Sequence, residues 1–476
     1  TGEGETHNLY KEVEIVATDL TRISTKAQQC PELVFTSLYH HVTDVDNLRE
    51  CFLSLDERKA AGIDGKSKAD YEDRLEENLR ELSARLAKHG YRPSPKRRTY
   101  VPKPGSDKKR PLGISTVEDK IVEEAMKRVL EPLWEPLFRD FSYGYRTDKS
   151  AQECVNQLGG TIQQRPVNHV VEADIRGFFD NVNHEWLIKF VEQRVGDPRM
   201  MRLLKRMLKG GIMENGIKTE TEAGTPQGSI LSPLLSNIYL HYVLDLWFDK
   251  KVSPKCRGEA YLFRFADDFV ACFEREAEAE LFRHRLKDRL EGFSLELAQE
   301  KTRTLPFGRK ARACDRKTGQ FEFLGFTFYC GRTRRGDFKV KRRTSRKKKI
   351  DFLQRFTAWI KAKRHLYRTG ELLKRARSRI TGHLNYYAIT DNSEQCQKVL
   401  RAATRILYKW LNRRSQKKSY NWNTFNKVLR CIGWPVMRVR HNMCPFRVQL
   451  KFTSGAGCGK SARPVLRGTR GATGTR

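Results

Sequence analysis

The stretch RFADDFVACF, from Arg264 to Phe273, decides how the rest of the sequence is interpreted. It places two adjacent aspartates, Asp267 and Asp268, between runs that are otherwise apolar or aromatic. Burying an unpaired carboxylate costs free energy or shifts its pKa, so two such groups need partners or access to solvent. Because aspartate suits turns, a hairpin with the pair at its tip is the simplest interpretation of this stretch taken alone.

A third carboxylate changes that interpretation. In the segment VVEADIRGFFD, Asp174 ends an apolar strand in the same way that Asp267 and Asp268 do. Carboxylates that converge at strand ends repel one another unless divalent cations lie between them, and hard cations such as Mg²⁺ prefer oxygen ligands. Two such ions, roughly 3.5–4 Å apart, form a clamp for in-line displacement at phosphorus. The three aspartates are therefore predicted to be metal ligands at the mouth of a cleft.

The net charge of +35 is concentrated in the C-terminal third of the chain. Residues 341–476 contain 35 Lys and Arg but only four acids, which leaves 57 basic and 53 acidic residues in 1–340. Such a surplus repels itself strongly unless a polyanion supplies the counter-charge. Nucleic acid is the natural candidate, and a membrane surface is a weaker one because no amphipathic anchor stands out.

The cysteines and the apolar runs exclude several classes of protein. Eleven cysteines are scattered singly without a CxxC pair, which indicates reduced thiols rather than a disulfide or zinc framework. No run reaches the roughly 18 consecutive apolar residues of a membrane span. The N-terminus has charges early and no apolar core of signal-peptide type. A cytoplasmic location, without a membrane partner, is therefore expected.

Three helix starts can be predicted from capping residues. Ser115, with Glu118 three residues later, is typical of a capping box. Asn183 suits the N-cap of the helix that follows the segment containing Asp174. Ser232 is expected to be an N-cap, with Pro233 at the first helical position.

The wider pattern favours an α+β body followed by a helical third. The pattern is helical from about 45 to 90, where Leu75, Leu79, Leu82 and Leu86 recur at three- and four-residue spacing, and residues 97–114 suggest strand, loop and strand. FEFLGFTFY, at 321–329, is expected to form a pair of strands. The tract 331–350 has 11 basic residues and one acid, which indicates a hinge, and the chain beyond it is expected to be mostly helical. Regular βαβ alternation is lacking, as in α+β folds.

Together these motifs resemble those of a reverse transcriptase, and most closely those of the group II intron-encoded reverse transcriptase/maturase family. The resemblance covers about residues 60–430, in the family's order and with sensible spacing. Where the family usually has tyrosine before ADD, this chain has Phe265, a departure that leaves the metal ligands intact. The matching segments are RPLGISTVEDKIVEEAM, SYGYR, ADIRGFFD, TPQGSILSPLLSNIYL, FADD, LELAQEKTRTLPFG, FEFLGFTFY, TGHLNYY and WLNRRSQKKSYNW.

The resemblance implies a right-hand polymerase, with fingers, a palm built on an antiparallel sheet, and an all-α thumb/maturase domain. The expected segments are a flexible N-terminal lead-in (1–44), the N-terminal extension and fingers (45–170), the palm with remaining fingers elements (171–335), the basic helical thumb/maturase domain (336–450) and a basic tail (451–476). Many relatives carry a DNA endonuclease domain with paired Cys and His at this end. We expect none in this chain.

The resemblance also assigns roles to the catalytic residues. Asp174 and Asp267 would bind two Mg²⁺ ions, with Mn²⁺ able to substitute, and the Ile175 carbonyl would complete one coordination shell. Asp268 would lie close by and assist.

Four further residues match nucleotide contacts of the family. Lys103 and Arg110, on the loop KPGSDKKR, match residues that grip the triphosphate; without the resemblance they would be interpreted as solvated loop charges. Gln227 would contact the incoming dNTP beside Gly228, which allows the backbone to turn closely. Lys301 is a candidate proton donor to the leaving pyrophosphate, although an exposed lysine is the commoner case.

A phenylalanine matches the position that selects the sugar. Phe179 corresponds to the aromatic residue beneath the sugar that excludes a 2′-hydroxyl and so favours dNTPs. The alternative is a core phenylalanine, because Phe178 is adjacent and only one of the two can face the sugar.

Past the hinge, the basic helices would grip nucleic acid. Aromatic residues among them could stack on bases, although most are expected to be core: Tyr386, Tyr387, Trp410 and Trp422. The residues expected to contact bound RNA are Arg413, Arg414, Lys417 and Lys418. Phosphate contacts give affinity without reading sequence, so specificity for one folded RNA would come from shape.

The resemblance predicts an RNA-directed DNA polymerase that doubles as a maturase. Its partners would be its own group II intron RNA, an RNA template with a DNA primer, target DNA and dNTPs, and nucleic acid would associate it with the bacterial nucleoid. One alternative is an RNA-binding splicing cofactor in which polymerisation is dispensable, but three clustered carboxylates argue against it. Another is a free-standing reverse transcriptase employed in phage defence or beside CRISPR systems.

Overall fold

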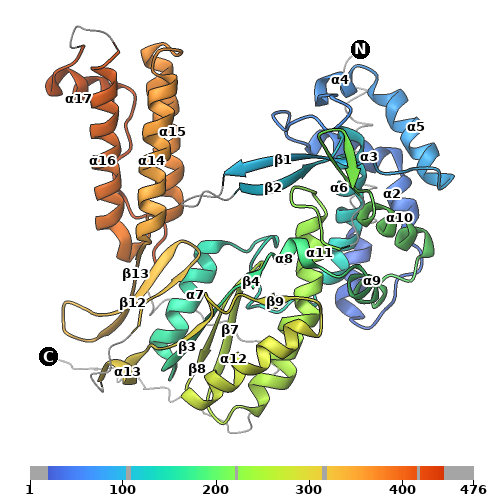
Figure 1. Cartoon of the computed structure of the whole chain (residues 1–476), viewed down its shortest axis with the longest axis horizontal. Helices are drawn as coiled ribbons and strands as arrows, with labels where there is room; N and C mark the ends of the chain where they lie inside the picture. The colour runs from blue at the N-terminus through green and yellow to red at the C-terminus, as the bar shows by residue number, and fades with distance from the viewer. Residues whose placement is uncertain (1–19, 103–108, 220–222, 314–318, 415–418, 444–476) are drawn as a thin grey trace, which may run out of the picture.

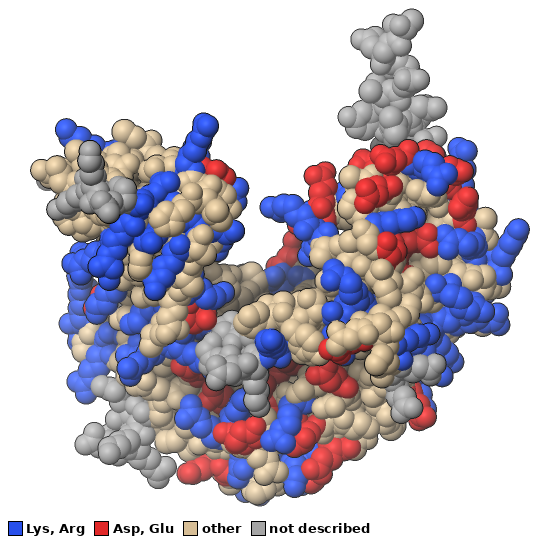
Figure 2. All heavy atoms as spheres, turned by 45° about the horizontal axis from the view of Figure 1, so that its top comes forward, with Lys and Arg blue, Asp and Glu red and all other residues tan. Residues whose placement is uncertain are grey.

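The computed structural model describes residues 20–102, 109–219, 223–313, 319–414 and 419–443. Helices and antiparallel sheets are both present, which confirms the predicted α+β class (Figure 1). Two arms rise from a base of β-sheet, one built from N-terminal elements and one from the C-terminal helices (Figure 1). Figure 2 shows a deep hollow between the arms, with Lys and Arg dense on the arm of C-terminal helices.

The base is a four-stranded antiparallel sheet in the order β10–β3–β8–β7. Its strands are β3 (His169–Ala173), β7 (Ala260–Phe265), β8 (Asp268–Phe273) and β10 (Arg303–Pro306). Helices α7 (Ala151–Gln164) and α12 (Glu276–Glu291) contact it. Successive residues of β8 alternate, with Val270 in the hydrophobic cluster that includes α7 and Phe269 in the cluster that includes α12. The apolar run after Asp268 is therefore a strand buried on both faces.

An N-terminal lobe surrounds a second sheet in the order β2–β1–β5–β6. Its strands are β1 (Lys96–Pro102), β2 (Lys109–Ile114), β5 (Ile212–Glu214) and β6 (Ile217–Thr219). Its helices are α2 (Tyr39–Thr43), α3 (Val45–Ser54), α4 (Lys68–Glu72), α5 (Leu75–Ala87), α6 (Val117–Trp134), α9 (His184–Glu192) and α10 (Pro198–Leu208). The helices predicted within about 45–90 are present as α3, α4 and α5, although residues 55–67 between α3 and α4 are not helical. The strands predicted within 97–114 are present as β1 and β2, and residues 103–108 of the loop between them lie outside the described residues.

Short elements connect the lobe to the base. The two-stranded sheet β4–β9 extends from the end of β3, and α11 continues into π-helical turns. These elements are β4 (Ile175–Arg176), α8 (Phe178–Asn181), α11 (Ser232–Leu240), η1 (His241–Asp245), η2 (Phe248–Val252), η3 (Ser253–Lys255), β9 (Glu296–Leu297) and α13 (Arg309–Ala313).

The N-cap of α6 lies one residue later than predicted. Thr116, not Ser115, accepts the N–H of Asp119 on its side chain. The hydroxyl of Ser115 is instead buried between Lys96 and Glu123. The predicted capping box is wrong because the Ser115 hydroxyl forms hydrogen bonds with Lys96 and Glu123 and does not cap the helix.

The other two helix starts differ in outcome. Asn183 caps α9 as predicted, since its side chain accepts the N–H of Trp186 at 3.0 Å. For α11 the cap residue is Leu231 and has no side-chain cap, because the Ser232 hydroxyl donates to the Pro226 carbonyl at 3.0 Å.

The tract 331–350 is not a hinge. The three-stranded sheet β11–β12–β13 runs through it and leads directly into a helix. Its strands are β11 (Phe321–Phe323), β12 (Phe326–Arg332) and β13 (Phe338–Thr344), which confirms the predicted strand pair. Within β13, Val340 is buried and Arg342 is a buried partner of Asp391 at 2.7 Å. The charge composition of this tract predicted a hinge and not a strand, because composition does not show that alternate residues of β13 face inward.

The C-terminal region is helical, as predicted, and has its own hydrophobic core. Its helices are α14 (Arg346–Lys363), α15 (Thr369–Tyr387), η4 (Thr390–Asn392), α16 (Ser393–Leu411) and α17 (Trp422–Cys431). In α16, Val399, Leu400, Ala403, Leu407 and Leu411 are buried at helical spacing. The basic residues occupy the remaining, solvent-facing side.

The expected lead-in, 1–44, is folded where the structure describes it. Residues 20–29 are helical, and the backbone N–H groups of Leu38 and Tyr39 each donate to Asp197 Oδ2 at 2.9 Å. This segment therefore belongs to the N-terminal lobe, and the contact was invisible in sequence because its partner lies far along the chain.

Two further observations concern the classes excluded by composition. Among the described residues, no helix is both long and apolar enough to cross a membrane. The eight cysteines in that part of the chain are free thiols.

Candidate active site

The aspartate pair lies at the tip of the β7–β8 hairpin. Phe265 pairs with Asp268, so Ala266 and Asp267 form a two-residue turn. Ala266 has a φ of 55°, in the left-handed region that hairpin turns of this length require. The hairpin predicted from the sequence is therefore present, with Asp267 on the turn and Asp268 at the start of β8.

A buried polar network holds this turn from behind. The fully buried Arg264 makes two bonds to Asp245, from Nε to Oδ1 at 2.7 Å and from Nη2 to Oδ2 at 2.5 Å. Its Nη1 donates to Asn237 Oδ1 at 3.0 Å and to the Ala266 carbonyl at 3.1 Å. A Cβ on Gly144 would lie 2.2 Å from the Ala266 nitrogen, so only glycine fits there. The turn is fixed by packing and by charge-assisted hydrogen bonds.

Asp174 reaches the same edge of the sheet from the neighbouring strand. Ala173 pairs with Phe269 in the antiparallel β3–β8 ladder, which places Asp174 opposite Asp268. The Asp174 carbonyl accepts the N–H of Ala298 at 2.8 Å, and Ile175 continues into β4 with a buried side chain. The three aspartates, which we call the aspartate cluster, are thus brought together as predicted.

Electrostatics show that the cluster carries excess negative charge. Burial, followed by the charge of Asp174, raises the pKa of Asp267. Burial, followed by the charges of Asp267 and Asp174, raises the pKa of Asp268 to about 6. The Asp268 side chain is solvent-accessible but surrounded by protein that displaces part of its hydration. A site with these properties favours a bound cation.

A lysine ammonium group supplies part of the positive charge that the aspartate cluster attracts. Lys301 forms an ion pair with the Asp174 carboxylate, and this contact raises the pKa of the lysine. Among the described residues, no three His, Cys, Asp or Glu side chains meet closely enough to form a ready-made metal site. The donor set nevertheless fits a hard cation, since it consists of carboxylate oxygens whose like charges oppose one another and which already hold an ammonium group.

The N-terminal lobe brings basic groups toward the cluster. Arg110 is exposed on β2, and its positive charge opposes the rise in the pKa of both Asp267 and Tyr145. Arg110 thus interacts electrostatically with Asp267, and its contact with the triphosphate stays a prediction. Lys103, the other expected triphosphate ligand, lies outside the described residues.

The choice between the two phenylalanines is resolved by burial. Phe178 is 2% exposed and contacts the Tyr239 ring, so it is the core residue. Phe179 is half-buried, and its carbonyl accepts the N–H of Thr225 at 2.7 Å. Phe179 is thus the one available to a ligand, beside the loop that carries Gln227.

The loop 225–230 is fitted closely against β2. The Gln227 carbonyl accepts the N–H of Gly113 at 2.7 Å, which leaves the half-buried Gln227 side chain beside the sheet. Gly228 has a φ of 108°, and a Cβ there would lie 2.8 Å from the Gly113 carbonyl oxygen. Glycine is required at this position on both counts.

Tyr145 is a site residue to which no role was given from the sequence. It is 56% exposed, its φ of 58° is unusual for a non-glycine residue, and its ring lies 6.5 Å from that of Phe265. Partial burial, followed by the charges of Asp267 and Asp268, raises its pKa. The segment SYGYR was the available signal, but the motif alone does not say which tyrosine is exposed.

In the C-terminal helices the expected RNA contacts have different environments. Arg413 is exposed, with its guanidinium 5.5 Å from the Trp410 ring. Arg414 is half-buried and donates to Thr369 Oγ1 at 2.7 Å and to the Tyr367 carbonyl at 3.0 Å. Lys417 and Lys418 lie outside the described residues.

Cations gather around a single indole ring in this region. Lys361, Arg364 and Lys409 lie 4.9, 4.7 and 5.9 Å from the Trp410 ring centroid, in addition to Arg413. The four aromatic residues expected to be mostly core all pack into the hydrophobic clusters or onto neighbouring rings: Tyr386, Tyr387, Trp410 and Trp422. Trp410 thus lies between the core and a positively charged surface, and its ring attracts the neighbouring cations through cation–π contacts.

A second basic surface was not foreseen. A groove of about 960 Å³ lies along α10 in the N-terminal lobe. Its charged lining residues include one acid, Glu192, and six cations, Arg92, Arg202, Lys205, Arg206, Lys209 and Lys218. The helix buries its methionines and leucines and turns its cations outward, a pattern that the segment PRMMRLLKRML already contains.

Comparison with known proteins identifies the family of the region that contains these residues. Residues 101–328 match the family described as reverse transcriptase (RNA-dependent DNA polymerase). Protein YkfC of Escherichia coli K12 is 31% identical over 371 residues, which are 71% of this chain and 94% of that protein. The group II intron-encoded protein LtrA of Lactococcus lactis is 36% identical over 252 residues, 50% of this chain and 41% of LtrA. The match therefore spans well under half of LtrA.

A plant relative extends the comparison. Nuclear intron maturase 3 of Arabidopsis thaliana mitochondria is 26% identical over 129 residues, 27% of this chain and 18% of that protein. The matched family region contains the whole aspartate cluster and the loop 225–230. The chain belongs to the reverse transcriptases, and within them to the family of group II intron-encoded reverse transcriptases and maturases.

Proposed function

We propose that the protein is an RNA-directed DNA polymerase that extends a primer on an RNA template by two-metal nucleotidyl transfer. The observation that carries the proposal is the convergence of Asp174, Asp267 and Asp268 at one sheet edge, with raised pKa values on the last two. In this proposal the central sheet is the palm, the N-terminal lobe the fingers, and α14–α17 the thumb.

The proposed segments follow from these assignments. The fingers and N-terminal extension occupy 45–170, the palm with remaining fingers elements 171–335, and the thumb/maturase domain 336–450. The hydrogen bonds of Leu38 and Tyr39 to Asp197, the N-cap of α10, add the described part of the lead-in to the fingers side. The hollow between the arms in Figure 2 is where a template–primer duplex would lie.

Mg²⁺ ions would be held by the carboxylates of Asp174 and Asp267 and by the Ile175 carbonyl, with Asp268 beside them. When bound, such ions neutralise charge on the phosphates and lower the pKa of the attacking hydroxyl. The chain's own groups would then bind and orient the substrate. Arg110 would pair with the triphosphate, Phe179 would exclude a 2′-hydroxyl, and Gln227 would contact the nucleotide.

Lys301 has a different part in this scheme. Its ion pair with Asp174 keeps it protonated, and a cation bound by that carboxylate would free the ammonium group. Lys301 would then lie near the leaving pyrophosphate with a proton to donate.

The basic surfaces support the maturase part of the proposal. The cations around Trp410 and those along α10 have few acidic partners, so a polyanion would complete them. We propose the parent intron RNA and target DNA as these ligands, with roles in splicing and retrohoming.

Primer extension tests the proposal. Wild type and the Asp267→Ala/Asp268→Ala variant would receive an annealed RNA template and DNA primer, dNTPs and Mg²⁺, and binding of a structured intron RNA would be measured at several salt concentrations. Extension by wild type alone supports the polymerase. Tight RNA binding without extension by either protein would instead favour a splicing cofactor.

A further inference from the structure

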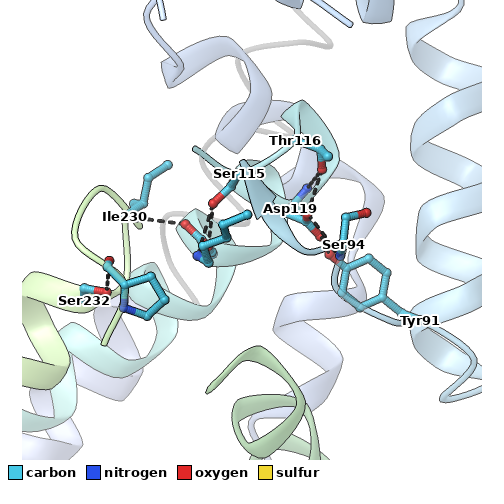
Figure 3. A network of polar contacts seen from close by, with 10 residues as sticks. Tyr91, Ser94, Ser115, Thr116, Asp119, Ile230 and Ser232 are labelled. Carbon is cyan, nitrogen blue, oxygen red and sulfur yellow. Dashed lines mark hydrogen bonds and ion pairs between the residues drawn. The ribbon is translucent and has the colours of Figure 1, made fainter. Parts of the chain in front are cut away.

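A buried polar network joins α6, the start of β1 and the loop 225–230 (Figure 3). Glu123, on α6, is 1% exposed and forms an ion pair with Lys96 at the start of β1. Ser115 donates to Glu123 Oε1 at 3.0 Å and accepts from Lys96 Nζ at 3.1 Å. The second carboxylate oxygen, Oε2, accepts the backbone N–H of Ile230 at 2.8 Å. One buried carboxylate thus bridges the sheet and the loop 225–230.

The bridge links the two protein segments that would form the nucleotide pocket. Lys96 begins β1, whose partner strand β2 carries Arg110. Ile230 ends the loop that carries Gln227, and the Gln227 carbonyl is bonded to the Gly113 N–H of β2. The loop is therefore held at two points, by the sheet backbone at Gln227 and by Glu123 at Ile230.

The bond to Ile230 also lies at the start of α11. The cap residue of that helix, Leu231, has no side-chain cap of its own. A carboxylate beside the first amides of a helix is electrostatically favourable. Glu123 therefore supplies a side-chain acceptor beside the start of a helix whose own cap residue provides none.

A second buried acid on the same helix provides a contrast. Asp119, one turn earlier, is 3% exposed and contacts Tyr91, the Ser94 N–H and the Thr116 hydroxyl (Figure 3). All of these partners belong to the N-terminal lobe, and none is in the loop. Glu123 and Asp119 lie on the same helix and are both buried, but only Glu123 forms a hydrogen bond with the loop 225–230.

We infer that Glu123 is a positioning residue for the nucleotide pocket: it fixes the loop 225–230, and with it Gln227, relative to the sheet that carries Arg110. Lys96 and Ser115 orient the carboxylate so that its free oxygen meets Ile230. A buried ion pair is often no more stabilising than apolar residues of similar size. The role inferred for the Lys96–Glu123 pair is therefore to orient the carboxylate toward Ile230, rather than to add stability. The inference rests on the proposed polymerase function.

Two double variants of the full chain isolate the contact. Lys96→Met/Glu123→Gln and Lys96→Met/Glu123→Met both remove the buried charges, but only glutamine keeps an oxygen for the Ile230 N–H. We expect the KM for dNTP to be about tenfold higher in the methionine variant, because a buried N–H loses its acceptor. We expect kcat to differ by less than about threefold, since no group that would touch the reacting atoms changes. Hydrogen exchange of the peptide containing Ile230 should be faster in the methionine variant.

Asp119→Asn is the matched control, and it should lower thermal stability while leaving the dNTP KM unchanged. With an active wild type, equal KM values in the two double variants would overturn the inference. If wild type extends no primer, the proposed function fails, and the exchange comparison still decides whether Glu123 fixes the loop. Equal exchange rates would then overturn that part as well.

Discussion

The aspartate cluster and the C-terminal helices present opposite electrostatic problems. At the cluster, three carboxylates meet at one sheet edge, where burial and their mutual repulsion raise the pKa values of Asp267 and Asp268. On the helices, many cations share a surface with few acids, and four of them surround one tryptophan. Each surplus points to a ligand of opposite charge. The first is local and depends on geometry, whereas the second is spread over many residues, so substitutions should act very differently on the two.

The largest effect is expected at the cluster. Asp267→Ala should lower DNA synthesis by about 10³-fold or more, because metal-assisted charge stabilisation is worth several kcal/mol. Affinity for a structured RNA should change by less than about twofold, since its phosphate contacts lie elsewhere. Primer extension and filter binding measure the two quantities. Asp288→Ala, an exposed acid on α12, is the control; a large loss of RNA affinity in Asp267→Ala alone would show that the two regions do not act separately.

A smaller effect is expected from a neutral side chain of the same site. Phe179→Ala should raise incorporation of ribonucleotides relative to deoxyribonucleotides by up to about 10²-fold, the discrimination that a shape-based pocket achieves against one hydroxyl. The measurement is the ratio of kcat/KM for the two kinds of nucleotide. Phe178→Ala should instead reduce stability by about 3–5 kcal/mol without changing that ratio, because its ring is in the core. A shift in sugar preference with Phe178→Ala would reverse the two assignments.

The same contrast explains what the sequence could and could not predict. Asp174 directly follows an apolar strand, Asp268 begins one and Asp267 lies in the turn between two, so their places at strand ends are local signals, and the family motifs add their role. The contacts that position the site are not local: Arg264 reaches Asp245 across 19 positions and Glu123 reaches Ile230 across 107. The residues around Arg264 or Glu123 do not indicate which distant residue each will contact.

The errors have the same physical origin. Ser115 was assigned to a cap that Thr116 forms, because the serine is engaged by Lys96 and Glu123. Composition predicted a hinge over 331–350, but alternation within β13 turns Arg342 inward to Asp391. Charge counts describe a surface well only when the backbone does not alternate its residues between surface and core.

The diffuse charge of the C-terminal helices should respond in proportion to the number of cations removed. Lys361→Glu/Arg413→Glu should weaken RNA binding and reduce the slope of log K against log salt by about 2, one for each phosphate left without its cation. Binding titrations across a salt series measure this slope. Arg285→Glu/Lys287→Glu on α12 changes the net charge equally and should leave the slope nearly unchanged. Equal slopes for the two variants would mean that net charge, rather than this surface, governs binding.

The smallest effect separates two neighbouring arginines within that region. Arg414 donates to Thr369 and to the Tyr367 carbonyl, whereas Arg413 is exposed beside Trp410. Arg414→Ala should therefore lower the free energy of unfolding by about 1–3 kcal/mol, because two acceptors lose a charged donor, and should leave the salt slope of RNA binding unchanged. Arg413→Ala should do the opposite, with little change in stability and a slope reduced by about 1. Denaturant unfolding and salt titration of both variants distinguish these outcomes. If Arg414→Ala changed the salt slope as much as Arg413→Ala, the guanidinium of Arg414 would have to leave Thr369 and Tyr367 to reach phosphate, and the RNA-bound helices would differ from those in Figure 1.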